Sequence, residues 1–222
     1  VIAFSSGGMM EEFCVKNKIN YKRIESIHSP RASFMKFLFS IMNILNSILL
    51  IDKNDIVESI DQLSKFQKVI NSQNLSDSNP SLNLAKFISE IPLIYYPYGL
   101  ESAAIRFKSS LQENAKTHVI IEDIVEACHN GIVAWEKPSK IKPILLQGYD
   151  DSEKTKERFE IIREFFTKNN IEFNEITSVS GNILTKLLTL TYLLDYASIY
   201  RAILSEIDPT PVSSINFVKS RL

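Results

Sequence analysis

The sequence lacks an excess of charge of either sign, and it has few cysteines. Its 222 residues include 25 Lys and Arg against 26 Asp and Glu, so the formal net charge is −1. A chain balanced in this way has no broad attraction for nucleic acid or an anionic membrane, and neither partner is expected. Cys14 and Cys128 form no CxxC motif, which favours a reduced, cytoplasmic protein; a disulfide between them is the alternative.

Motifs for metals, nucleotides and nucleophilic hydrolysis are missing too. The three histidines, His28, His118 and His129, lack the spacing of a zinc or iron centre. No GxGxxG, P-loop or GxSxG pattern occurs, so we expect neither a metal nor a cofactor. Hydrophobic residues make up 45% of the chain and charged residues 23%, which is typical of a globular protein with one large or two small domains.

A secretory signal is also absent. The apolar run Val1–Phe4 is short, and no basic residues precede it. Because the sequence does not begin with Met, we interpret it as the continuation of a longer protein. The run from Phe34 to Ile51 is more apolar, but Lys36, Asn43 and Asn46 interrupt it, which favours a buried helix over a membrane span.

The second half of the chain alternates short apolar runs with longer helical patterns. The predicted strands are 92–96, 119–121, 143–147 and 171–177, and the predicted helices are 101–116, 123–130, 152–168 and 183–207. Strands joined through helices imply a parallel sheet with helices on both faces, which is a three-layer α/β fold. Ligands of such sheets bind at the carboxyl ends of the strands, beside helix N-termini.

The first half of the chain is less regular. Strands are predicted at 1–4 and 22–27, and helices at 9–17, 29–50, 55–70 and 82–89, with a last helix at 215–221 near the end of the chain. Asn71–Pro80 is rich in Ser, Asn and Asp, and it is the best candidate for a domain boundary or a mobile insert.

One segment is more informative than any other, namely Cys128-His129-Asn130-Gly131-Ile132-Val133-Ala134-Trp135-Glu136. It resembles the His-Asn-Glu-Ile-Val-x-Trp-Glu signature of the archaeal and bacterial bifunctional phosphoglucose/phosphomannose isomerases, which have the sugar isomerase (SIS) fold. In that signature, the acidic residue after His-Asn is the base that moves the substrate proton. Gly131 stands at this position, so the resemblance leaves the base without a side chain.

Further segments resemble the same family in the same order along the chain. They are Ser5-Ser6-Gly7-Gly8, Ser29-Pro30-Arg31-Ala32, Arg106-Phe107-Lys108, Gln112-Glu113-Asn114-Ala115-Lys116, Asp195-Tyr196-Ala197-Ser198-Ile199-Tyr200 and Asp208-Pro209-Thr210-Pro211-Val212. The resemblance implies a remnant of a first SIS domain with a linker helix at 1–50, a linker helix and polar loop at 51–81, and a C-terminal SIS domain at 82–222. It also implies a homodimer.

The resemblance assigns roles to particular residues. Aldose–ketose isomerisation through an enediol requires a base and groups that stabilise two oxygens. The implied catalytic positions are Arg31, His129 and Gly131, the last as the family's base position. The implied substrate-binding residues are Ser5, Ser6, Gly7, Gly8, Asn130, Thr210 and Lys219. The implied reaction needs no metal.

Each of these residues also has a structural interpretation. Arg31 could instead cap helices between domains, and His129 could form a structural hydrogen bond. Thr210 could stabilise a turn. Glu136 matches the second Glu of the signature, which is not the base, so a surface role is expected; Arg106 favours a salt bridge to a neighbouring helix. The string Ser178-Val179-Ser180-Gly181-Asn182 is similar to the family's phosphate loop by chance, and we interpret it as a helix cap.

Two function hypotheses follow. The first is a homologue of glucose-6-phosphate/mannose-6-phosphate isomerase, acting on glucose, mannose or fructose 6-phosphate, with impaired activity because of Gly131. The second is a non-catalytic SIS protein that binds a phosphosugar or serves assembly. Two further departures favour the second hypothesis: no His follows His129, and the family's Ser/Thr-rich phosphate loop is absent.

Overall fold

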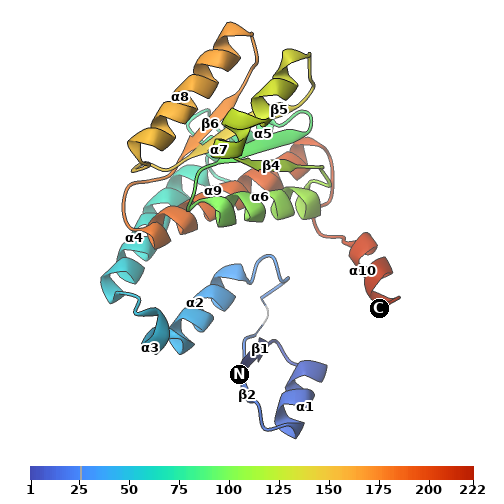
Figure 1. The fold of residues 1–222 in the computed structure, drawn as a ribbon. Helices are drawn as coiled ribbons and strands as arrows, with labels where there is room; N and C mark the ends of the chain where they lie inside the picture. Colours follow the sequence, from blue (N-terminus) through green and yellow to red (C-terminus); the bar gives the residue numbers. More distant parts are fainter. Residues whose placement is uncertain (26) are drawn as a thin grey trace. The chain divides into compact units, whose positions relative to one another are not determined.

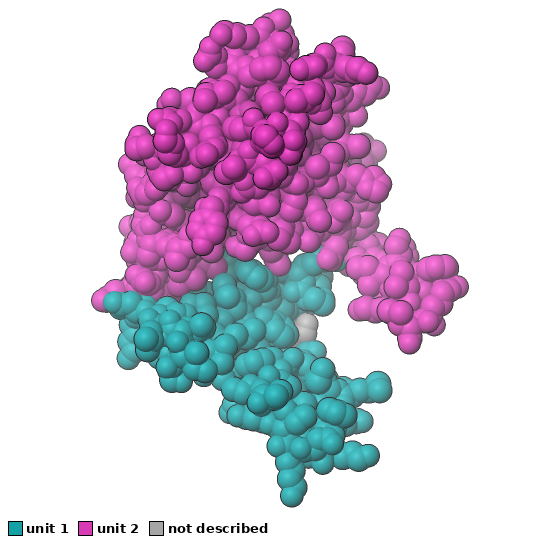
Figure 2. All heavy atoms as spheres, viewed as in Figure 1, with its two compact units in different colours: residues 1–53 teal, residues 54–222 magenta. Residues whose placement is uncertain are grey.

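The computed structural model describes residues 1–25 and 27–222, which form two compact units. The first unit is Val1–Lys53 and the second is Asn54–Leu222 (Figure 2). The domain bounds expected from the sequence, namely 1–50, 51–81 and 82–222, stay a prediction.

The second unit is built on a four-stranded parallel sheet. Its strands are β3 (Pro92–Tyr96), β4 (Ile120–Asp123), β5 (Lys142–Gln147) and β6 (Asn174–Thr177), in the order β4-β3-β5-β6. All three neighbouring pairs are parallel. The chain therefore reaches the carboxyl end of every strand at one edge of the sheet, which we call the carboxyl edge, and starts every strand at the opposite, amino edge.

Helices precede, connect and follow these strands. They are α4 (Lys53–Ile70), α5 (Pro80–Phe87), α6 (Glu101–Asn114), α7 (Ile124–His129), the 3₁₀ helix η1 (Gly131–Glu136), α8 (Glu153–Lys168), α9 (Ile183–Leu204) and α10 (Ser213–Lys219). The sequence expectation ran α7 to Asn130 and α9 to Ile207, so α9 ends three residues early. No residue of α10 is buried.

Alternate strand residues pack on opposite faces of the sheet, as the two-residue period of a strand requires. Ile94, Ile144 and Leu146 join a core with side chains of α5, α6 and α9. Leu93, Tyr95 and Leu145 join a second core with side chains of α7, η1 and α8. The sheet therefore lies between two helical layers (Figure 1), and the predicted three-layer α/β fold with a parallel sheet is confirmed.

Three helices begin just after strands at the carboxyl edge, and each has a side-chain cap. Asp123 accepts a hydrogen bond from the Val125 amide at 2.7 Å before α7. The Ser152 hydroxyl accepts from the Thr155 amide before α8, and the Asn182 side chain accepts from the Thr185 amide at 2.9 Å before α9. Short polar side chains at these positions satisfy amides that the first helical turn leaves unpaired.

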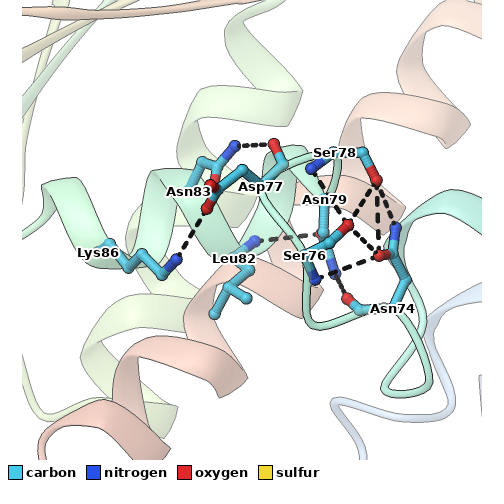
Figure 3. A network of polar contacts seen from close by, with 8 residues as sticks. All are labelled: Asn74, Ser76, Asp77, Ser78, Asn79, Leu82, Asn83 and Lys86. Atoms are coloured by element: carbon cyan, nitrogen blue, oxygen red, sulfur yellow. Dashed lines mark hydrogen bonds and ion pairs between the residues drawn. The ribbon is translucent and has the colours of Figure 1, made fainter.

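The polar loop 71–79 is tied to the start of α5. Asn79 is fully buried, accepts hydrogen bonds from the Ser81 and Leu82 amides, and donates to the Asn74 carbonyl at 2.8 Å (Figure 3). Asn74, Ser76 and Ser78 bond to one another within the loop. The loop lies inside the second unit rather than at the division between the two units.

The first unit contains a short parallel strand pair. Strands β1 (Ile2–Ser5) and β2 (Asn20–Arg23) are joined through α1 (Met9–Lys16), and α2 (Phe34–Ile44) and α3 (Asn46–Leu49) follow. The strand expected at 22–27 instead ends at Arg23, because β1 ends at Ser5; Ser26 lies outside the described residues.

The prediction of a single helix at 29–50 is wrong. The chain turns at 30–33, where the Ser33 hydroxyl bonds to the Ile27 backbone and the Ser29 carbonyl, so α2 begins at Phe34. The helix breaks at Leu45, and Leu50 adopts a left-handed conformation with φ of 45°. In α2 only Met42 is buried, so the expectation of a buried helix also fails.

In the second unit, two strands begin later than the sequence predicts. The strand expected at 171–177 begins at Asn174, because Asn170 takes a left-handed φ of 53° and Ile171 still bonds back to α8 through the Phe166 carbonyl. The strand expected at 119–121 instead covers Ile120–Asp123, where β3 provides its hydrogen-bond partner.

Candidate functional site

Glu122 and Gly131 meet close to the carboxyl edge of the sheet. Glu122 is the penultimate residue of β4, and Gly131 is the first residue of η1, which the chain enters after α7. A Cβ atom built on Gly131 would lie 2.5 Å from both carboxylate oxygens of Glu122. The Glu122 carboxylate therefore occupies the space that a side chain at residue 131 would fill.

The backbone does not explain why residue 131 is glycine. Gly7, Gly8, Gly99 and Gly181 have the positive φ angles that favour glycine, whereas Gly131 is not among the positive-φ residues. A larger residue would fit the backbone of η1, but its Cβ would collide with Glu122. A side chain at residue 131 would therefore require the Glu122 carboxylate to move from its present place.

The Glu122 carboxyl group lies in an environment that disfavours its charge. Burial raises its pKa above the ordinary value of 4.5, and the neighbouring Glu126 carboxylate raises it further. The register places Tyr95 of β3 beside Glu122. Burial raises the pKa of the Tyr95 hydroxyl to about 12, although a hydrogen bond from the Trp135 indole, at 2.8 Å, acts in the opposite direction.

His129 and Asn130 lie directly before Gly131, and both are exposed. His129 ends α7. The Asn130 side chain donates to the Glu126 carboxylate at 3.3 Å, and the Asn130 backbone carbonyl accepts from the Val133 amide. The motif thus gathers His129, Asn130 and the Glu122 carboxylate around one turn of the chain, with Glu126 alongside.

A second polar group follows β5 and β6 at the same edge. The Asp151 carboxylate accepts from the Gly148 amide at 2.8 Å, and burial raises the pKa of Asp151. Lys186 of α9 pairs with Asp150 at 2.9 Å. The Ser178 hydroxyl accepts from the Tyr149 amide at 3.0 Å, which joins the loops after the two strands.

The string Ser178–Asn182 ends in the cap of α9. The Asn182 side chain accepts from the Thr185 amide and donates to Glu58 of α4 at 3.0 Å. The interpretation of this string as a helix cap is confirmed. The Asn182 side chain thus links α4 to the start of α9.

The family match decides where this fold belongs. Residues 77–222 match the model of the bacterial phospho-glucose isomerase C-terminal SIS domain. The chain belongs to this family. The matched segment contains β3 to β6 and both polar groups of the carboxyl edge, so the SIS family suggested by the motifs is confirmed.

Similarity to curated and solved proteins runs along the whole chain. The bifunctional phosphoglucose/phosphomannose isomerase of Caldicellulosiruptor bescii is 29% identical over all of this chain and 68% of its own length. The enzyme of the same name from Aquifex aeolicus is 21% identical over all of this chain and 67% of its own length. The chain thus spans about two thirds of these relatives.

A solved structure shows the same fold. A glucose-6-phosphate isomerase-like protein from Thermus thermophilus superposes with a TM-score of 0.69 at 14% identity, covering 94% of this chain and 73% of that one. At this level of identity, the comparison supports the SIS-type architecture and carries no residue roles.

Several residues that the SIS resemblance points to lie in the first unit. The Ser5 hydroxyl accepts from the Gly7 amide at 3.2 Å and bonds with the Tyr21 hydroxyl at 3.0 Å. Ser6 is exposed, and Gly8, the residue directly before α1, has a φ of 72°. Arg31 is half-buried in the turn before α2.

The remaining predicted residues lie near the end of the family domain. The Thr210 amide donates to the Asp208 carboxylate at 2.8 Å, and Lys116 donates to the Pro211 carbonyl at 2.7 Å. Lys116 lies between α6 and β4, so it holds this turn near the amino edge, away from Glu122. Lys219 is exposed in the last turn of α10.

A cleft of about 700 Å³ opens at the amino edge instead. Its lining comes from the segments that lead into β3, β5 and β6: Ser89, Glu90, Trp135 to Lys142, and Asn169 to Glu172. Glu136 lines this cleft, at the opposite end of η1 from Gly131. Glu136 is exposed, as expected for a surface residue.

Arg106 forms the ion pair expected of it. Its guanidinium donates to Asp195 of α9 at 2.7 Å, and the Ser110 hydroxyl donates to the same carboxylate at 2.7 Å. This bridge fastens α6 to α9 within the family domain.

Three further observations concern possible metal ligands, the cysteines and the lengths of the helices. Within it, no group of three or more His, Cys, Asp and Glu residues is arranged to hold a metal ion. Cys14 and Cys128 are free thiols, so the alternative of a disulfide is not realised. Across residues 1–25 and 27–222, every helix is too short or too polar to span a bilayer.

Sequence reasoning missed Glu122. The residue stands in Val119-Ile120-Ile121-Glu122-Asp123, where an ionisable side chain next to the end of an apolar strand was a usable signal. Its relation to Gly131 depends on the turn that α7 makes, which the sequence pattern does not describe.

Proposed function

We propose that the protein is an aldose–ketose isomerase of sugar 6-phosphates, interconverting glucose or mannose 6-phosphate with fructose 6-phosphate. The observation that carries this proposal is the similarity to bifunctional phosphoglucose/phosphomannose isomerases along the entire chain. Membership of the phospho-glucose isomerase family over residues 77–222 supports the same reaction class.

The proposed roles follow the family resemblance. Arg31 would stabilise the oxygens of the enediolate, because a guanidinium stays charged and offers a planar pair of donors. Ser5, Ser6, Gly7 and Gly8 would bind the phosphosugar together with Asn130, Thr210 and Lys219, and His129 would assist near the reacting carbons. The protein would act as a cytoplasmic homodimer, with residues 1–50 as the remnant of a first SIS domain.

A second proposed function is that of a non-catalytic SIS protein, and Gly131 is the residue that favours it. A protein that lacks the base would bind a phosphosugar, or serve an assembly, without turnover. Gly131 has no side chain to accept a proton, and no His follows His129 in the sequence. This observation favours weak or absent catalysis and leaves binding intact.

A coupled assay separates the two functions. Purified protein is given fructose 6-phosphate, and the formation of glucose 6-phosphate is followed by its oxidation with a coupling dehydrogenase. Turnover well above that of heat-inactivated protein supports the isomerase. Absent turnover, combined with calorimetric binding of fructose 6-phosphate, supports the non-catalytic phosphosugar-binding function. Absent binding contradicts both the isomerase and phosphosugar binding, and leaves the assembly function.

A further inference from the structure

The Glu122 carboxylate lies directly against the backbone of Gly131. Both oxygens of Glu122 lie 2.5 Å from the point where Gly131 would carry a Cβ, a distance at which the two groups exclude each other. A glycine at residue 131 therefore admits the Glu122 carboxylate, and a larger residue there would displace it. The fold therefore brings a carboxylate from β4 next to residue 131, which has no side chain of its own.

Glu122 is also placed where SIS-type sheets offer chemistry. It is the penultimate residue of β4, close to the carboxyl edge, and its side chain is half-buried beneath the turn that carries His129 and Asn130. Among the described residues, none makes a hydrogen bond or ion pair with its carboxylate. The group is therefore not committed to a structural partner.

The surroundings prepare this carboxyl group for proton transfer. Burial and the Glu126 carboxylate both raise its pKa. A base whose pKa is raised toward neutrality accepts a proton more readily from a carbon acid, and it returns that proton without difficulty.

We propose that Glu122 is the proton-transferring base of the isomerisation, in the position left open by Gly131. The proposal rests on the proposed isomerase function. With Glu122 as the base, the reaction would not require an acidic residue after His-Asn.

The step conserves atoms and electrons. The Glu122 carboxylate takes the proton from C2 of the open-chain aldose, and the electrons of the C2–H bond form the C1=C2 double bond of an enediolate. The C1 carbonyl oxygen takes up the negative charge. A proton moves from the C2 hydroxyl to the C1 oxygen, Glu122 returns its own proton to C1, and C2 becomes the carbonyl of the ketose.

The Glu122→Gln substitution tests the inference, because Gln keeps the shape and removes the base. We expect kcat to fall by about 10²–10⁴-fold, the usual contribution of a general base. The affinity for fructose 6-phosphate, measured by calorimetry, should stay within threefold. The matched control is Glu136→Gln, which alters an exposed carboxylate of the same motif and should keep the parent kcat.

The possible outcomes separate the inference from the function on which it rests. A parent protein that neither turns over nor binds fructose 6-phosphate contradicts the proposed function. An active parent whose Glu122→Gln variant keeps more than a third of kcat, or loses binding together with kcat, overturns the role of Glu122 alone. A parent that binds without turnover overturns the role of Glu122 and supports the non-catalytic function.

A second experiment moves the carboxylate from residue 122 to residue 131 and tests whether either residue can supply the base. The Glu122→Ala change removes the carboxylate and empties the space, and Gly131→Glu then places a carboxylate there from the other residue. We expect the double variant to regain at least tenfold in kcat over Glu122→Ala. A double variant no faster than Glu122→Ala overturns the equivalence of the two positions.

Discussion

The two edges of the four-stranded sheet differ in the surroundings of their charged groups. At the carboxyl edge, burial raises the pKa of both Glu122 and Asp151. At the amino edge, Lys142 pairs with Glu172 at 2.5 Å and also lies over the Phe87 ring. The amino edge has the 700 Å³ cleft, whereas the carboxyl edge holds carboxyl groups that are costly to ionise.

On the proposed function, the size of a hollow is a poor guide to chemistry in this fold, because the cleft and the Glu122 carboxylate lie at opposite edges. In the Lys142–Glu172 pair at the amino edge, the Glu172 side chain is largely exposed, so the pair contributes little to stability. Carboxyl groups kept in partly buried positions cost stability, and such costs are typical of functional sites. The short helix η1 connects the two edges, with Gly131 at one end and Trp135 in the cleft lining at the other.

The largest expected effect comes from removing the anchor of η1. Trp135→Ala should lower the free energy of unfolding by about 3–5 kcal/mol, because it deletes a buried aromatic side chain. The indole packs edge-on against Phe166, with ring centroids 5.2 Å apart, and bonds to Tyr95. Urea denaturation followed by circular dichroism measures the change. The control is Val133→Ala in the same helix, where the side chain is 56% exposed; a loss below 1 kcal/mol for Trp135→Ala would show that the anchor is unimportant.

The next effect concerns the packing of Gly131. Gly131→Ala should lower kcat by about 100-fold, because the added Cβ displaces the Glu122 carboxylate and small misplacements of a catalytic group are costly. The same coupled assay measures it. Ser139→Ala at the amino edge is the control and should keep the parent activity. If the Gly131→Ala variant keeps more than a third of the parent kcat, the contact between Gly131 and the Glu122 carboxylate has no consequence for catalysis.

A smaller effect concerns stability and pH. The raised pKa of Glu122 means that the folded state disfavours its charge, so this carboxylate destabilises the protein above that pKa. Glu122→Gln should therefore raise Tm at pH 7.5, and the difference should close as the pH falls below the ordinary value of 4.5. Thermal denaturation at the two pH values measures this.

A variant of opposite sign serves as its control. Lys168 lowers the pKa of Glu164, so that carboxylate stabilises the folded state above the ordinary value of 4.5. Glu164→Gln should therefore lower Tm at pH 7.5. A Tm that falls for both variants would show that Glu122 is a stabilising residue.

The smallest effect is expected at the amino edge. Glu172→Gln removes one partner of the pair with Lys142, but the Glu172 side chain is 70% exposed. Water screens such a pair, so the free energy of unfolding should change by less than about 1 kcal/mol, and isomerisation should not change. An activity loss above threefold would place the amino edge in the functional site.

Much of the family domain followed from local sequence signals. The apolar runs at 92–96 and 143–147 predicted β3 and β5 closely, because a fully buried strand needs hydrophobic side chains on both faces. The polar residues before 124, 153 and 183 act as helix caps, which depend only on neighbouring amides. Such signals predict which elements exist.

Where elements end was decided by their partners. The strand at 22–27 stops at Arg23 because β1 stops at Ser5, and β6 starts late because Ile171 still bonds to α8. The helix at 29–50 breaks at the turn that Ser33 fastens and again at Leu45. A periodic pattern carries no record of such contacts.

The sequence alone was sufficient for the α/β class and for the SIS family, since strand–helix alternation and the ordered motifs around His129 and Asn130 are properties of neighbouring residues. It also showed that residue 131 has no carboxylate. Only the tertiary structure revealed that the Glu122 carboxylate lies against Gly131, because their approach depends on the path of the backbone through α7 and on the absence of a single Cβ.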